Sequence, residues 1–229
     1  MSDLEEIKAL IAACSPEQQT ELFTHLRERM GLGDLHPFEV AMNARGEVIL
    51  EALSRAGALN IRSVRGCLSE ATFFTEIVAH LDNWQNVTPP GDLPYDAALR
   101  DETGTVTVQV KLQRRATAGG VMLPVIKNGH ALAELQRTRN GTDGAGAATR
   151  PYRFGEFDLL AVCMEPSHGT WSSFMYAPER WLLPRPERAL IQIMQPVSLV
   201  RDAIWTNDFR EAVVRLRSEL PRPAAGVLI

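Results

Sequence analysis

The sequence predicts an α/β fold in which helices flank a mixed central sheet, with a helical region attached at the N-terminus. Two observations lead to this prediction. Apolar residues follow helical spacing through the first third of the chain. After the proline-rich stretch NVTPPGDLP (86–94), apolar residues alternate with a period of two or form short continuous runs, as in strands. With 229 residues, 45% of them hydrophobic, the chain can bury one sizeable core.

Three helices are expected before the strands. Ser15 and Pro16 are typical of a helix start, since serine caps and proline suits the first helical position. A second helix is expected from Phe38 to Arg55, and a third from Ser63, as its cap, to Leu81. We therefore divide the chain into a helical N-terminal region, 1–62, and a core domain, 63–229.

The remaining elements follow in order. PYDAALRDETGTVTVQVK (94–111) predicts a hairpin, VMLPVIK (121–127) is a short apolar segment, and GHALAELQRTR (129–139) predicts a helix. NGTDGAGAATRP (140–151) is glycine-rich and predicts a loop. FDLLAVCM (157–164) predicts a buried strand, WSSFMYA (171–177) a neighbouring strand, and 209–220 a helix.

Charge is distributed unevenly. The net charge is −4, which argues against non-specific coating of nucleic acid. Residues 105–155, however, contain eight basic and two acidic residues and carry +6. A basic surface on an acidic body suits a protein that engages an anion at one place.

Membrane and export signals are not expected. The sequence has no apolar run near 18 residues and no basic start followed by an apolar block. Three scattered cysteines, Cys14, Cys67 and Cys163, favour a reduced, cytoplasmic protein.

The hairpin gathers polar residues at its open end. If Glu102 and Thr103 form a two-residue loop, paired residue numbers sum to 205 and Asp96 faces Gln109; a bulge at Gly104 would shift Asp96 to Val110. Either register places Asp96 beside Gln109 and Lys111, whereas the alternating valines face a core.

These groups suit a metal-dependent hydrolysis. A carboxylate and an amide oxygen are hard ligands for Mg²⁺, and the Val110 carbonyl can add another. The Lys111 ammonium can hold or polarise a water beside the metal, and attack of metal-bound water on a phosphodiester is a plausible outcome. The competing interpretation is a solvated edge hairpin whose polar face touches water.

Pro94-Tyr95-Asp96 and Gln109-Val110-Lys111 resemble the PD-(D/E)xK nuclease superfamily, and within it the type II restriction endonucleases. The resemblance extends over residues 63–180, with two departures. Tyr95 is an extra residue in the motif, and Gln109 stands where the family usually has an acid. The second departure removes one charge from the metal site.

The resemblance implies a restriction-endonuclease-like core that cuts double-stranded DNA at a specific short site, using Mg²⁺, as a homodimer. The product would carry a 5′-phosphate. It also implies a supplementary acid from the preceding helix, for which Glu70 is the first candidate and Glu76 the second. Residues 1–62 would serve dimerisation or DNA contact.

A further set of residues is expected to contact DNA, because arginine and lysine bind phosphates, arginine and glutamine can also read base edges, and the set lies in the basic block. It comprises Arg114, Arg115, Lys127, Gln136, Arg137, Arg139, Arg150, Tyr152 and Arg153. Two alternative functions remain at this point: a sequence-specific DNA-binding protein on the same fold that has lost cleavage, and a structure-specific repair nuclease.

Overall fold

The computed structural model shows a mixed α/β protein, and it describes residues 3–29, 36–119, 121–136, 151–187, 189–218 and 220–223. The chain divides into two compact units, Met1–Ile61 and Arg62–Ile229. Each unit is described by itself below.

The first unit is helical. Its helices are α1 (Asp3–Ala13), α2 (Pro16–Arg29), α3 (Pro37–Met42) and α4 (Gly46–Ser54), and α5 (Ala58–Thr72) begins at its end. The predicted start of α2 is confirmed, because the Ser15 hydroxyl accepts a hydrogen bond from the Gln18 amide at 3.3 Å. The single helix expected over 38–55 is wrong. Asn43 adopts a left-handed φ of 46°, which ends α3 and separates it from α4.

The second unit is built around a five-stranded mixed sheet with the order β1-β2-β3-β8-β9. Its strands are β1 (Gln85–Asn86), β2 (Ala97–Asp101), β3 (Gly104–Leu112), β8 (Leu159–Cys163) and β9 (Phe174–Pro178). β3 and β8 are parallel, and the other neighbours are antiparallel. The hairpin and the two later strands were predicted from sequence, and the structure confirms them.

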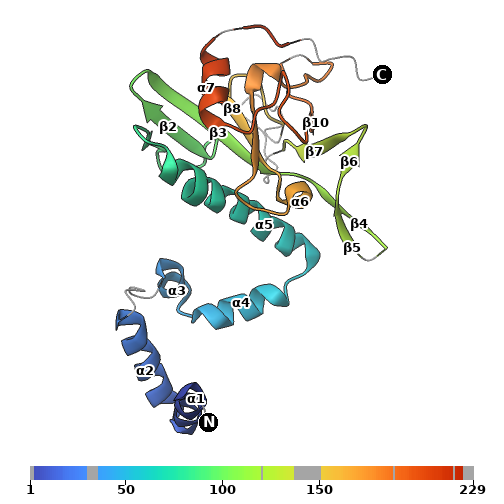
Figure 1. Cartoon of the computed structure of the whole chain (residues 1–229). Coiled ribbons are helices and arrows are strands. Elements are labelled where there is room, and N and C mark those ends of the chain that lie inside the picture. Colours follow the sequence, from blue (N-terminus) through green and yellow to red (C-terminus); the bar gives the residue numbers. More distant parts are fainter. Residues whose placement is uncertain are drawn as a thin grey trace. The chain divides into compact units, whose positions relative to one another are not determined.

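Helices cover one face of this sheet (Figure 1). α5 continues into a π-helical segment, Phe73–Ile77, and a 3-10 turn, Val78–His80, so the predicted helix begins five residues before Ser63. Buried Phe73 and Phe209, the first residue of α7 (Phe209–Arg217), pack on Val106, Val108 and Val110 of β3. The alternating valines therefore face a core, as expected.

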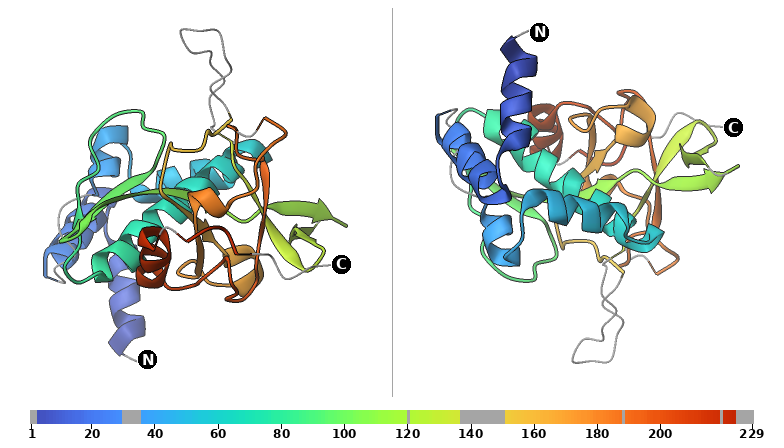
Figure 2. Two further views of the ribbon diagram at one scale, coloured as in Figure 1. Left: turned by 90° about the horizontal axis from the view of Figure 1, so that it is seen from above. Right: turned by 90° about the horizontal axis from the view of Figure 1, so that it is seen from below.

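Two smaller sheets complete the unit. One has the order β10-β7-β6, formed by β10 (Met194–Val197), β7 (His130–Glu134) and β6 (Ile126–Lys127), and the short helix α6 (Glu165–His168) follows β8. β4 (Arg115–Ala118) and β5 (Val121–Pro124) form a hairpin that projects from the rest of the unit (Figure 2). A second core, including Tyr152, Ile191 and Trp205, covers the other face of the central sheet.

The helix predicted over 129–139 is wrong, because residues 130–134 form strand β7. Alanine, leucine and glutamate favour helix locally, but Ala131 and Ala133 are buried alternately between β6 and β10. Gly129, with φ 75°, forms the tight turn from β6 into β7. Pairing within the sheet thus overrides the local helical preference.

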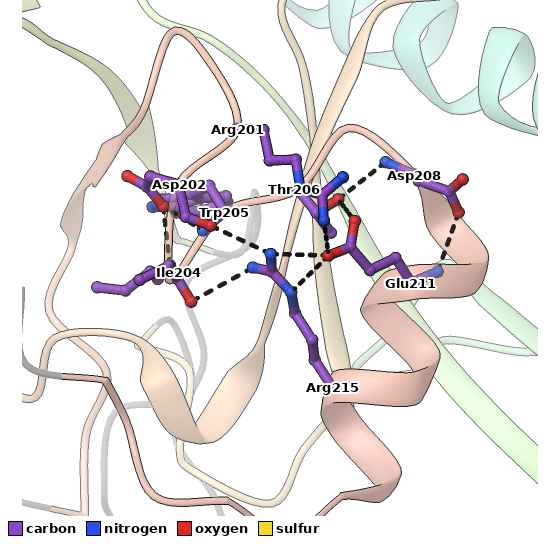
Figure 3. Close-up of polar contacts among 9 residues, drawn as sticks. Arg201, Asp202, Ile204, Trp205, Thr206, Asp208, Glu211 and Arg215 are labelled. Atoms are coloured by element: carbon purple, nitrogen blue, oxygen red, sulfur yellow. Dashed lines mark hydrogen bonds and ion pairs between the residues drawn. The ribbon is translucent and has the colours of Figure 1, made fainter.

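Polar contacts fix α7 at its N-terminal end (Figure 3). The Asp208 carboxylate caps the helix by accepting from the Glu211 amide at 2.9 Å. The Glu211 carboxylate accepts from the Thr206 hydroxyl at 2.5 Å and from Arg215 Nη2 at 2.9 Å. Arg215 also donates to the Asp202 carbonyl at 3.1 Å. This network ties the helix to the loop before it.

No helix among the described residues combines the length and apolar character that crossing a membrane requires.

Candidate active site

The hairpin register brings Asp96, which directly precedes β2, to the level of Val108 and Gln109. Paired residues of β2 and β3 have numbers that sum to 205, as in Ala97 with Val108, so the two-residue loop is the one that forms. Gly104 closes the turn with φ 143°, a conformation that side-chain-bearing residues rarely adopt. The Asp96 amide donates at 3.0 Å to the carbonyl of Val108, the residue that also pairs with Ala97, and this bond holds Asp96 at the open end of the hairpin.

The Asp96 carboxylate is held by β3. Its Oδ2 accepts from the Val110 amide at 2.7 Å and from the Gln109 side-chain amide. Gln109 Nε2 also donates to the Val110 carbonyl at 3.2 Å, and Gln109 is only 1% exposed. Two oxygens, from Asp96 and Val110, therefore converge on a single buried amide group.

Three charged groups share this place. Burial raises the pKa of Asp96, and the Lys111 ammonium is the largest influence that opposes the rise. Burial also raises the pKa of Glu70 on α5; the negative charge of Asp96 raises it further, and Lys111 lowers it. Glu70, Asp96 and Lys111 are thus close enough for each carboxylate to respond to the lysine.

An aromatic ring accompanies the Lys111 ammonium. Nζ lies 5.4 Å from the centroid of the Tyr152 ring, a distance at which the ring attracts a cation. Tyr152 is itself buried and packs edge-on against Phe157, with ring centroids 5.6 Å apart. This packing gives the ring a fixed position beside the lysine.

The oxygen donors suit a hard divalent cation. Among the described residues no three histidine, cysteine or acidic side chains gather as a metal site. The oxygens of Asp96 and Val110, however, already face one donor, the Gln109 amide. With the Gln109 amide turned over, its oxygen and those of Asp96 and Val110 would be three oxygen donors, the type of ligand that Mg²⁺ prefers. The residues present therefore fit Mg²⁺.

The two candidates for a supplementary acid differ in position. Glu70 lies on the last full turn of α5 and is half-buried beside Asp96 and Lys111. Glu76 lies on the π-helical segment and is exposed. It lines a shallow cavity of about 360 Å³ together with Leu68 and Trp171. The geometry favours Glu70.

The predicted DNA-contacting residues are dispersed. Arg114 pairs with Glu134 at 3.3 Å, and Lys127 and Arg153 are exposed. Gln136 lies at an isolated bridge to Pro151. Tyr152 is buried and Arg115 lies close to Glu165. Arg137, Arg139 and Arg150 lie outside the described residues.

Sequence reasoning missed two charged residues near this site, Arg65 and Glu165. Arg65 lies on α5, five residues before Glu70, and its side chain forms an ion pair with Glu165. The basic residue on the helix was visible in the sequence. Its partner was not, because Glu165 is 100 residues away along the chain.

No protein-family model matches the sequence. No curated protein is significantly similar to it. Among solved structures, the chain is similar to "The structure of a bacterial homing endonuclease: I-Ssp6803I", with 22% identity, 54% of this chain and 70% of that chain covered, and a TM-score of 0.34. A likeness at this TM-score supports no conclusion about activity, which has to come from the residues of the site.

Proposed function

We propose that this protein is a Mg²⁺-dependent endonuclease of the type II restriction class, which hydrolyses phosphodiester bonds of double-stranded DNA at a specific short site. One observation carries the proposal: Asp96, the Gln109 amide, the Val110 carbonyl and Lys111 converge at one end of a hairpin, beside Glu70. The resemblance of 94–96 and 109–111 to the PD-(D/E)xK motif supports the same function.

Each group of the candidate site would have its own role. Asp96, Gln109 and the Val110 carbonyl would hold Mg²⁺, and Glu70 would hold a second ion or organise water. When bound, Mg²⁺ lowers the pKa of a coordinated water and stabilises negative charge on the phosphate. Two carboxylates with raised pKa values suit this task, because a divalent cation favours their charged forms.

Lys111 would act on the reacting groups directly. Its ammonium orients the attacking water and offsets the charge that develops on the phosphate. Tyr152, whose ring lies beside the ammonium, would hold the lysine in position. The burial of Tyr152 suits this role better than direct contact with DNA.

Other surfaces would bind DNA and a second copy. Arg114, Lys127 and Arg153 are at least partly exposed and can reach phosphates. In the N-terminal unit no described side chain is buried, and apolar residues such as Leu10 and Leu50 are exposed. Covering such apolar surface would favour association, so we assign this unit to a homodimer. The three cysteines are free, which fits a cytoplasmic protein.

The test is cleavage of varied DNA in Mg²⁺ by the wild type, Asp96→Ala and Lys111→Ala. We expect discrete fragments from the wild type and a loss of about a hundredfold or more in rate for each variant. Asp82→Ala and Lys8→Ala are matched controls, because both side chains are well exposed. Equal cutting by the wild type and Lys111→Ala, or no cutting by the wild type, would reject the proposal.

A second candidate is a DNA-binding protein that has lost cleavage. One observation favours it: Gln109 replaces an acid, and its amide donates to Asp96 as a resident neutral partner. This alternative predicts specific, salt-sensitive DNA binding that Lys111→Ala leaves unchanged and that cleavage never follows.

A further inference from the structure

Two arginines from different elements meet at one carboxylate. Arg65 on α5 pairs with Glu165 Oε2, and Arg115 Nη2 at the start of β4 lies 3.9 Å from Glu165 Oε1. The three side chains are mostly covered, with exposed fractions of 22% for Arg65, 25% for Arg115 and 15% for Glu165. Arg65 also lies over the Trp171 ring, 4.9 Å from its centroid. We call Arg65, Arg115 and Glu165 the arginine pair site.

The arginine pair site has unused capacity for an anion. Two guanidinium groups and one carboxylate leave a net charge of +1. The Nε of Arg65 and the Nε of Arg115 are both buried and have no hydrogen-bond partner among the residues that the structure describes. A buried donor without an acceptor is unfavourable, so Glu165 does not satisfy all the donors of the two guanidinium groups. The anion that suits two guanidinium groups is a phosphate or a similar oxyanion.

The arginine pair site is built on the two segments that also carry Glu70 and Lys111. Arg65 precedes Glu70 by five residues of α5, which is about 7.5 Å along a helix axis. Arg115 follows Lys111 by four residues, about 13 Å along an extended chain. Glu70 interacts with Lys111, and Arg65 and Arg115 meet at Glu165. α5 and the β3–β4 segment therefore each contribute at least one residue to both sites.

We propose that Arg65 and Arg115 form a second anion site, which binds a backbone phosphate of the DNA strand next to the phosphate that is cleaved. Glu165 holds the two guanidinium groups together and limits their net charge before DNA binds. This inference rests on the proposed function and deepens it, because it adds a positioning contact for the strand. The competing interpretation is an ion-pair group that only supports the fold.

The two interpretations predict opposite effects of Glu165→Gln on the affinity for DNA. In a purely structural group, removal of either partner is harmful or neutral. In an anion site, Arg65→Gln removes a phosphate contact and weakens DNA binding, whereas Glu165→Gln removes the competing carboxylate and strengthens it. Arg65→Lys keeps the charge but loses the planar fork, so it should retain the salt dependence of binding and lose part of the affinity.

The experiment measures binding of the full-length chain to a labelled duplex at several salt concentrations. All variants are made in the Lys111→Ala background, so that cleavage does not interfere. We expect Arg65→Gln to reduce the slope of log K against log salt by about one, which is about a fourfold change in relative affinity between about 50 and 200 mM salt. Glu165→Gln should lower the dissociation constant. Arg210→Gln, an exposed charge change on α7, should leave the slope unchanged.

Circular dichroism and thermal melting of each variant show that it is folded before binding is interpreted. If Arg65→Gln misfolds, the double variant Arg65→Gln/Glu165→Gln removes both partners of the Arg65–Glu165 ion pair and leaves Arg115 as the single guanidinium of the site, and it too should show the smaller slope. An unchanged slope in the folded arginine variant, or weaker binding by Glu165→Gln, overturns the arginine pair site. The binding experiment needs no cleavage, so the smaller salt slope of Arg65→Gln can be observed even if the nuclease proposal fails. If the wild type cuts DNA but Arg65→Gln leaves the salt slope of binding unchanged, this inference alone is rejected.

Discussion

Replacing Glu179 with glutamine tests how the second unit tolerates a buried carboxylate. Glu179 begins the 3-10 turn Glu179–Trp181 after β9 and is only 7% exposed. Its Oε1 accepts from the Gly155 amide at 2.5 Å. Burial raises its pKa to about 7; the Gly155 amide opposes the rise, and the negative charges of Asp158 and Glu156 add to it.

The magnitude follows from that pKa. A rise from 4.5 to about 7 corresponds to about 3 kcal/mol at about 1.4 kcal/mol per pH unit. Between these values the folded chain binds more protons at this carboxyl than the unfolded chain does. The contribution of this protonated carboxyl to folding stability is therefore fully present below pH 4.5 and is lost as the pH rises through about 7. Glutamine can keep the hydrogen bond to Gly155 and does not ionise, so the stability of Glu179→Gln relative to wild type should increase by about 3 kcal/mol from acid to alkaline pH.

The assay is urea unfolding of both proteins across this pH range, followed by tryptophan fluorescence. All four tryptophans lie in the second unit and report its unfolding: Trp84, Trp171, Trp181 and Trp205. Glu102→Gln in the exposed hairpin loop is the matched control and should show no such change with pH. A stability difference between wild type and Glu179→Gln that stays constant with pH would show that burial does not penalise this charge.

Two other predictions concern the site and the core. Gln109→Glu places an acid beside Asp96, so the Mg²⁺ concentration that gives half-maximal cleavage should fall about tenfold, equivalent to about 1.4 kcal/mol; an equal or higher Mg²⁺ requirement would contradict the proposed ligand role. Phe73 is fully buried and makes edge contacts with Phe174 and Phe209 at centroid distances of 5.6 and 6.2 Å. Phe73→Ala should lower the free energy of unfolding by about 3–5 kcal/mol, whereas Val214→Ala on the exposed face of α7 should change it by less than about 0.5 kcal/mol, and similar losses for both would refute the packing argument.

The hairpin of the candidate site could be predicted from the sequence, because local chemistry determines its geometry. Asp101 and Gly104 define the hairpin turn, because the Asp101 carboxylate accepts from the Gly104 amide at 3.1 Å and the glycine supplies the unusual φ. Once the turn is fixed, strand pairing brings Asp96 close to Gln109 and Val110 without any information from distant residues. The alternating valines then determine which face meets the helices.

Features that depend on distant pairing were not accessible. The segment around Ala131 and Ala133 favours helix by composition, and only its partners in β6 and β10 make it a strand. The ion pair between Glu165 and Arg65 could not be predicted for the same reason, because it forms only when the chain returns through β8. Asn43 was overlooked for a different reason, since a single left-handed residue interrupts an otherwise regular helical pattern.

The charges of the candidate active site and the arginine pair site can be compared for glutamine and for an acid at position 109. Asp96 and Glu70 supply two negative charges and Lys111 one positive charge, so the site carries −1 when both carboxylates are ionised. A divalent cation would change this to +1, which complements one phosphodiester. With an acid at position 109 the loaded site would be neutral, and it would attract the substrate less. If the proposed function holds, Gln109 would lower the affinity for the cation but leave a charge that matches the +1 of the arginine pair site. On the proposed function, two sites of +1 each would complement two successive phosphates of one strand.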